Sequence, residues 1–242
     1  MSVEFEFLPL SENSITIKLG NEMTRTVHEQ VRGVMNHLTT PPLKGIIDVV
    51  PAYTTVTVYF DPMYFYDGVT LPYEKVCSTL KERLESLTVV HIKKGKEVVI
   101  PVCYGEEFGP DLEEVAKYLN LTPKEVVSIH TSGRYDVYML GFAPGFAYLG
   151  GMSERIATPR KKTPRLRIPV GSVGIASLQT GIYPIESPGG WQLIGKTPLP
   201  LFRPNHKQPS LLQIGDCVIF QSISKEEYRQ LEEEYDGNSC YP

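Results

Sequence analysis

The chain has 242 residues, of which 41% are hydrophobic and 21% charged, and its formal net charge is −4. This composition is typical of a folded protein, and the length favours two domains of ordinary size. The net negative charge argues against a general affinity for nucleic acid. No run approaches the ~20 apolar residues of a membrane span and the first residues do not resemble a signal peptide, so we expect a cytoplasmic protein that does not enter a membrane.

The first ninety residues predict a small α+β domain. The expected elements are strands at 3–10 and 14–19, a helix at 22–38, strands at 45–50 and 53–60, and a helix at 73–87. The helices are indicated by apolar residues at helical spacing, and the second strand pair by β-branched runs on either side of Pro51. This order of strands, helix, hairpin and helix resembles a ferredoxin-like domain over residues 1–90.

The pattern changes after about residue 90 to short strands separated by turns. The expected elements are strands at 96–104 and 135–142, helices at 111–119 and from Thr122, and an acidic helix from Ser224. Thr122 and Glu125 can form a capping box, as can Ser224 and Glu227. Because Gly and Pro recur every few residues beyond Gly141, residues 91–242 predict a mainly β barrel or sandwich that ends in the acidic helix.

Residues 190–197, GWQLIGKT, match the phosphate-binding pattern G-x-x-x-x-G-K-[ST]. A true phosphate loop opens a long helix whose N-terminus holds the phosphates. Here Pro198, Pro200 and Pro204 follow at once, and an interior proline costs a helix ~3 kcal/mol. We therefore do not expect a phosphate loop at this position.

The sequence does not predict a metal site. The four cysteines are far apart and form no C-x-x-C pair. His28 and His37 are nine residues apart on the expected helix, which places them on opposite faces. We expect both histidines to lie at the surface or to serve packing.

Three other residues allow two interpretations each. His130 can transfer protons, or it can be a structural histidine near a helix end. Arg160 and Arg165 each follow a proline in the basic segment 154–167. They can hold a carboxylate or phosphate on a stiff backbone, or form a solvated basic turn.

Three long motifs carry a resemblance to a known family. They are IPVCYGEEFGPDLEEVA at residues 100–116, VYMLGFAPGFAYLGGM at 137–152, and PRKKTPRLRIPVGSVGIASLQTGIYPIESPGGWQLIGKTPLPLF at 159–202. The chain closely resembles the KipI family, also called the B subunit of the prokaryotic 5-oxoprolinase and formerly allophanate hydrolase subunit 1 or kinase A inhibitor. Small departures are Val170, where the family usually has alanine, and Ser177, where it usually has glycine.

The resemblance implies both a fold and a function. The fold is an N-terminal α+β domain followed by a cyclophilin-like β-barrel. The function is to open 5-oxoproline to glutamate at the expense of ATP, with Mg²⁺, together with a homologous C subunit, which is KipA-like, and an A subunit. By resemblance, the B and C subunits phosphorylate the lactam and the A subunit then completes the hydrolysis. The amidase function in the older label is not expected, because the Gly- and Ser-rich nucleophile signatures are absent.

A second function implied by the resemblance is regulatory. The chain would bind a sporulation sensor histidine kinase and inhibit its autophosphorylation. An exposed apolar surface of the barrel could form that contact.

The enzymatic function gives a set of candidate site residues. We expect Arg160 and Arg165 to bind anionic groups and His130 to transfer protons. The binding candidates are Gln179, Thr180, Tyr183 and Lys196. The sequence leaves open which of these act on this chain rather than on its partner, and the oligomeric state.

Overall fold

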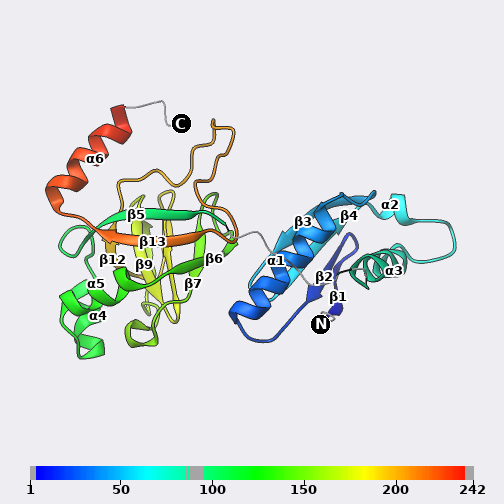
Figure 1. Ribbon diagram of the computed structural model, residues 1–242, viewed down its shortest axis with the longest axis horizontal. Helices are drawn as coiled ribbons and strands as arrows, with labels where there is room; N and C mark the ends of the chain where they lie inside the picture. Colours follow the sequence, from blue (N-terminus) through cyan, green and yellow to red (C-terminus); the bar gives the residue numbers. More distant parts are fainter. Residues whose placement is uncertain (1–3, 86, 88–94, 238–242) are drawn as a thin grey trace. The chain divides into compact units, whose positions relative to one another are not determined.

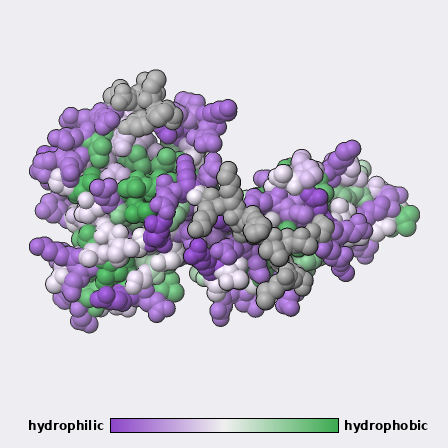
Figure 2. Space-filling view, viewed as in Figure 1, coloured by the Kyte–Doolittle hydropathy of each residue, from purple (hydrophilic) through white to green (hydrophobic). Residues whose placement is uncertain are grey.

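The computed structural model describes residues 4–85, 87 and 95–237 (Figure 1). The chain forms two compact units, one up to residue 93 and the other from residue 94. Each unit has hydrophobic clusters of its own. On the face shown in Figure 2, hydrophilic side chains cover much of both units, and the hydrophobic ones of the larger unit gather in separate patches.

The first unit is an antiparallel sheet with helices. Its elements are β1 (Glu6–Ser11), β2 (Ser14–Lys18), α1 (Arg25–Thr39), β3 (Ile46–Pro51), β4 (Thr55–Phe60), α2 (Pro62–Phe65) and α3 (Pro72–Glu85). The sheet order is β1-β2-β4-β3. Alternate residues of β4, such as Val56 and Val58, pack in one cluster with Val31 of α1 and Leu80 of α3. The predicted α+β composition and the hairpin of β3 and β4 are confirmed, whereas the ferredoxin-like name stays a prediction.

Helix α1 begins later than the sequence pattern indicates. The side chain of Thr24 accepts a hydrogen bond from the Val27 N–H, so Thr24 is the N-cap and Arg25 the first helical residue. The apolar spacing that starts at Met23 therefore includes a residue outside the helix, because spacing alone does not locate a cap.

The second unit is built on a closed β-barrel. Its elements are β5 (Glu97–Tyr104), α4 (Leu112–Leu119), α5 (Pro123–Ser132), β6 (Tyr135–Leu140), β7 (Ala147–Gly150), η1 (Glu154–Ile156), β8 (Arg165–Ile168), β9 (Ser172–Ala176), β10 (Gln179–Ile182), β11 (Ser187–Gly189), β12 (Gln192–Lys196), β13 (Cys217–Ser222) and α6 (Lys225–Gly237). Seven strands close the barrel in the order β10-β7-β6-β13-β5-β12-β9. The predicted barrel is thus confirmed, and the cyclophilin-like name stays a prediction.

Local sequence signals place the helices of this unit. Thr122 and Glu125 form both bonds of the predicted capping box at the start of α5. Ser224 and Glu227 exchange the same two bonds before α6. Figure 1 shows α4 and α5 at one side of the barrel and α6, in red, extending from it. None of the helices in the described residues is long and apolar enough to cross a membrane.

The segment that matches the phosphate-loop pattern is a wall of the barrel. Residues 192–196 form β12, which pairs with β5 and β9. The next element of the described chain after β12 is the strand β13, so no helix begins at this segment, as the prolines predict. Trp191, Leu193 and Ile194 are buried, which explains why a segment rich in Gly and Pro carries so many apolar residues.

Candidate functional site

The basic segment around Arg160 is hydrogen-bonded to residues 190–192, where β12 begins. The Lys161 N–H donates to the Gly190 carbonyl at 2.7 Å, and Gln192 Nε2 donates to the Pro159 carbonyl at 3.1 Å. Between these bonds, the Arg160 guanidinium carbon lies 6.0 Å from the centroid of the Trp191 ring. The backbone on both sides of Arg160 is therefore fixed, while its side chain stays exposed.

A buried carboxylate holds the two neighbouring cations. Asp111 Oδ1 accepts hydrogen bonds from Lys161 Nζ at 2.9 Å and from Arg165 Nη2 at 2.6 Å. Asp111 Oδ2 accepts from the Leu193 N–H at 2.7 Å. Asp111 precedes α4 but makes no side-chain capping bond to that helix. Its carboxylate instead joins the basic segment to β12.

The pKa of the Asp111 carboxyl lies below its usual value, although burial by itself would raise it. The hydrogen bonds from Arg165, from the Leu193 N–H and from Lys161 together outweigh that effect. Asp111 is therefore ionised at neutral pH, and its charge is shared by Lys161 and Arg165.

The Trp191 ring beside Arg160 belongs to an aromatic cluster. The Trp191 ring contacts Phe146 edge-on at 5.7 Å and Tyr148 at 6.0 Å, and Phe146 contacts Tyr183 at 5.2 Å. Burial raises the pKa of Tyr183 to about 12, and the nearby Arg160 charge acts in the opposite direction. Burial also raises the pKa of Tyr148, again opposed by Arg160. The Arg160 charge therefore acts on both phenols.

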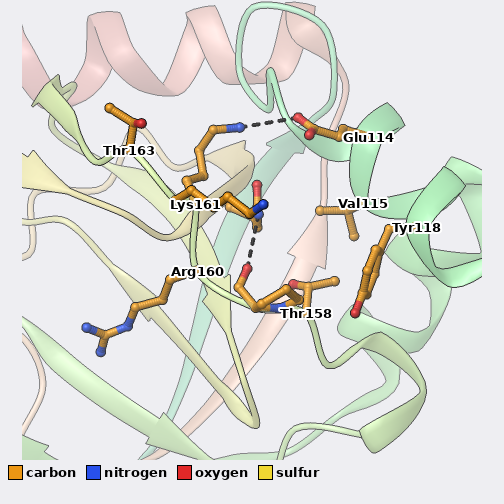
Figure 3. A pocket seen from close by; sticks show the side chains of 10 residues that line it. Glu114, Val115, Tyr118, Thr158, Arg160, Lys161 and Thr163 are labelled. Atoms are coloured by element: carbon orange, nitrogen blue, oxygen red, sulfur yellow. Dashed lines mark hydrogen bonds and ion pairs between the residues drawn. The ribbon is translucent and has the colours of Figure 1, made fainter.

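A cavity of about 420 Å³ lies beside the segment (Figure 3). Its lining consists of Glu114, Val115, Tyr118, Thr158, Pro159, Arg160, Lys161, Lys162, Thr163 and Gln192. Figure 3 shows Lys161 pointing towards Glu114, to which its ammonium is bonded at 3.2 Å, and Arg160 pointing away from Val115 and Tyr118. Arg160 is thus one of the residues that line this partly open cavity, although its guanidinium points away from Val115 and Tyr118.

His130 lies in the interior of the barrel, where it is fully buried. The Thr180 hydroxyl donates to the Gly174 carbonyl at 3.0 Å, so it accepts from His130 Nε2, also at 3.0 Å. His130 Nδ1 then accepts from the Tyr104 hydroxyl at 2.8 Å. Burial lowers the pKa of His130 to about 3, so this histidine is neutral at physiological pH. This chain of hydrogen bonds satisfies every polar atom of the imidazole and of the Thr180 side chain.

The predicted site residues therefore fall into separate groups. Arg160 lies over Trp191 beside Tyr183, whereas Arg165 is bonded to Asp111. His130 and Thr180 are bonded to each other in the core. Lys196, at the far end of β12, lies 5.6 Å from the ring centroid of Tyr228 in α6. Gln179, also predicted, is the first residue of β10.

Sequence reasoning missed Asp111 and Lys161 as partners. They are 50 residues apart in the chain, and Asp111 and Leu193 are 82 apart. No local pattern signals such contacts. Among the described residues, no group of three His, Cys, Asp or Glu side chains is placed to hold a metal ion.

The sequence departure at Ser177 has a structural meaning. Ser177 has a φ of +51°, in the left-handed region that favours glycine. Its N–H donates to the Thr158 carbonyl at 2.6 Å, so this turn supports the basic segment. A glycine would adopt the same conformation without the steric cost of a side chain.

Comparisons with known proteins define the class to which this chain belongs. Residues 5–212 match the family model for the carboxyltransferase domain, subdomains C and D, and the chain belongs to this family. Within it, the chain is 50% identical to the B subunit of 5-oxoprolinase from Bacillus subtilis (strain 168), over 97% of this chain and 99% of the relative. It is 41% identical to the corresponding B subunit from Haemophilus influenzae, over 88% of this chain and 95% of that one.

A solved structure shows the same fold in a longer chain. The crystal structure of TTHA0988 superposes with a TM-score of 0.75 at 33% sequence identity, over 88% of this chain. This chain corresponds to 40% of TTHA0988. The homologous region is therefore joined there to a longer stretch of further sequence.

Proposed function

We propose that this chain is the B subunit of a 5-oxoprolinase that converts 5-oxo-L-proline to L-glutamate. The observation that carries the proposal is the 50% identity to a 5-oxoprolinase B subunit over nearly the full length of both chains. We keep the division into domains at residues 1–90 and 91–242 as part of the proposal. The two compact units support it.

The chemistry requires that a stable amide become reactive. The lactam oxygen attacks the γ-phosphorus of ATP, the bond to the bridging oxygen breaks and ADP leaves. A first water then attacks the activated carbon and the C–N bond opens, which leaves an acyl phosphate and the free amine. A second water attacks the acyl carbon, and phosphate leaves with the former lactam oxygen. Cationic groups must stabilise the charge that develops on the transferring phosphoryl group.

We propose that the chain acts only in a complex with the A and C subunits, and that ATP with Mg²⁺ binds in the assembled complex. Two observations support a divided site. The segment that matches a phosphate loop is a barrel strand, so it does not offer a phosphate cradle. In TTHA0988 the homologous region shares one chain with further sequence.

Of the predicted site residues, the surroundings of Arg160 fit a ligand contact best. Arg160 is exposed, and Tyr183 lies within reach of its charge. The proton-transfer role of His130 stays a prediction. So do the binding roles of Thr180, Gln179 and Lys196. For Arg165 the ion pair with Asp111 favours a positioning role over direct contact with an anion.

The test is reconstitution. This chain would be co-expressed with the homologous C subunit, the A subunit would be supplied separately, and ATP-dependent glutamate formation from 5-oxo-L-proline would be measured. We expect activity that is lost when this chain is omitted. A folded, assembled complex without activity would contradict the proposal. Nothing in the described residues or among these relatives favours the kinase-inhibitor alternative.

A further inference from the structure

We infer that Arg160 binds the carboxylate of 5-oxo-L-proline and not the phosphates of ATP. The inference rests on the proposed function, which leaves open whether the basic segment serves the substrate or the nucleotide. Two observations support a contact with the substrate carboxylate: Arg160 has no carboxylate partner among the described residues, and its guanidinium is held over Trp191. The experiments below distinguish this contact from one with the phosphates of ATP.

The first argument is charge. Lys161 and Arg165 share the buried Asp111 carboxylate, and Lys161 also contacts Glu114. In the described part of the chain, no carboxylate forms an ion pair with Arg160. The exposed Lys162, which lines the cavity together with Arg160, also forms no ion pair with a described carboxylate. The Arg160 guanidinium, which has no carboxylate partner of its own among the described residues, matches a monoanionic carboxylate.

The second argument is geometry. The guanidinium is a planar fork that binds carboxylates through two parallel hydrogen bonds. Packing over the Trp191 ring restricts its motion, and the backbone bonds of Pro159 and Lys161 fix its base. Such preorganisation reduces the entropy lost when a ligand binds. The side chain points away from the cavity wall formed by Val115 and Tyr118 (Figure 3).

The kinetic test uses the reconstituted complex. Arg160→Met should raise the KM for 5-oxo-L-proline about 10- to 100-fold, which is the range expected for losing hydrogen bonds between charged groups. The KM for ATP should stay within about twofold of the wild-type value. Arg160→Lys keeps the positive charge but not the planar guanidinium. Its KM for 5-oxo-L-proline should lie between those of the wild type and Arg160→Met. The control is Arg167→Met, because Arg167 is an exposed arginine of the same segment whose side chain is 82% accessible. It should change neither KM.

A binding test reads the site directly, because Trp191 is the single tryptophan of the chain. Its fluorescence would be followed in the full-length chain, alone and in the complex, during titration with 5-oxo-L-proline and with its neutral amide. The wild type should bind the acid at least tenfold more tightly than the amide. Arg160→Met should lose this preference while keeping the native circular dichroism spectrum.

The outcomes separate the inference from the proposed function. An active complex in which Arg160→Met raises the KM for ATP, or neither KM, would overturn the inference and leave the function standing. An inactive wild-type complex would contradict the function. The carboxylate site would then stand if the chain still preferred the acid over the amide through Arg160, and it would be overturned if Trp191 fluorescence did not distinguish them.

Discussion

Arg160 and Arg165 are the same residue type, both follow a proline, and they lie in opposite environments. Arg165 is bonded to the buried Asp111, and its side chain is 27% accessible. Arg160 is exposed over Trp191. The difference arises because β8 begins at Arg165 and turns it inward, whereas Arg160 lies where the chain crosses the aromatic cluster. One arginine therefore stabilises the segment and the other is available to a ligand.

Asp111→Asn should destabilise the barrel unit. It would leave Lys161 and Arg165, both about three-quarters buried, without their shared carboxylate. We expect a loss of about 3 kcal/mol in the free energy of unfolding, as for a buried ion pair that loses one partner. Urea unfolding followed by Trp191 fluorescence measures it. Glu114→Gln, which removes only a 72% accessible partner, should cost less than about 1 kcal/mol. Equal losses would contradict this account.

His130 should make the stability of the barrel unit depend on pH. Its pKa is about 3 in the folded unit and 6.5 in the unfolded chain. Between these values the unfolded chain binds a proton that the folded unit does not, so stability rises with pH. Over pH 6.5 to 5 the free energy of unfolding should fall by up to about 1.4 kcal/mol for each unit of acidification.

Urea titrations at several pH values, followed by Trp191 fluorescence, check this dependence. Trp191 lies in the barrel unit, and His28, whose pKa burial also lowers, lies in the other. His130→Gln should remove most of the slope. A slope that persists in this variant would show that other groups cause it.

At the scale of the element, the segment that matches the phosphate-loop pattern forms the barrel strand β12, and its two glycines have different surroundings. Gly195 lies where strands approach closely. A Cβ there would come within 2.6 Å of Val102 Cγ1 and 2.9 Å of the Cys103 carbonyl oxygen. At Gly190 the nearest atom to an added Cβ is 3.6 Å away. The first glycine of the pattern has room for a side chain and the second does not.

Gly195→Ala should therefore destabilise the barrel by about 1–3 kcal/mol through overpacking. Gly190→Ala should change the free energy of unfolding by less than about 0.5 kcal/mol, as for substitutions away from packed sites. Thermal unfolding of the two variants side by side measures the difference. Similar midpoints would mean that β12 and β5 can separate to admit the methyl group.

At the scale of the molecule, the two units have separate clusters. Leu80 packs with α1 and the first sheet, and Trp191 packs in the barrel unit. Leu80→Ala should cost the first unit about 2–5 kcal/mol, as for other deletions of buried leucine side chains.

The midpoint measured by Trp191 fluorescence in urea should not move in this variant, while the circular dichroism transition should begin earlier. Wild-type protein in the same titration is the reference. A fluorescence midpoint that shifts together with the circular dichroism signal would show that the units unfold as one.

The sequence by itself determined the family and those helices and caps that depend on interactions between residues close together in the chain. The capping boxes at Thr122 and Ser224 and the amphipathic helices depend on residues three or four apart, so their spacing predicts them. The tertiary structure alone decided the site. It brought Asp111 to Lys161, Arg165 and Leu193, which are 50 to 82 residues away. It also placed His130 in the core and Arg160 at the surface. Burial and charge pairing across the closed barrel set these environments, and they depend on which strands meet rather than on neighbours in the chain.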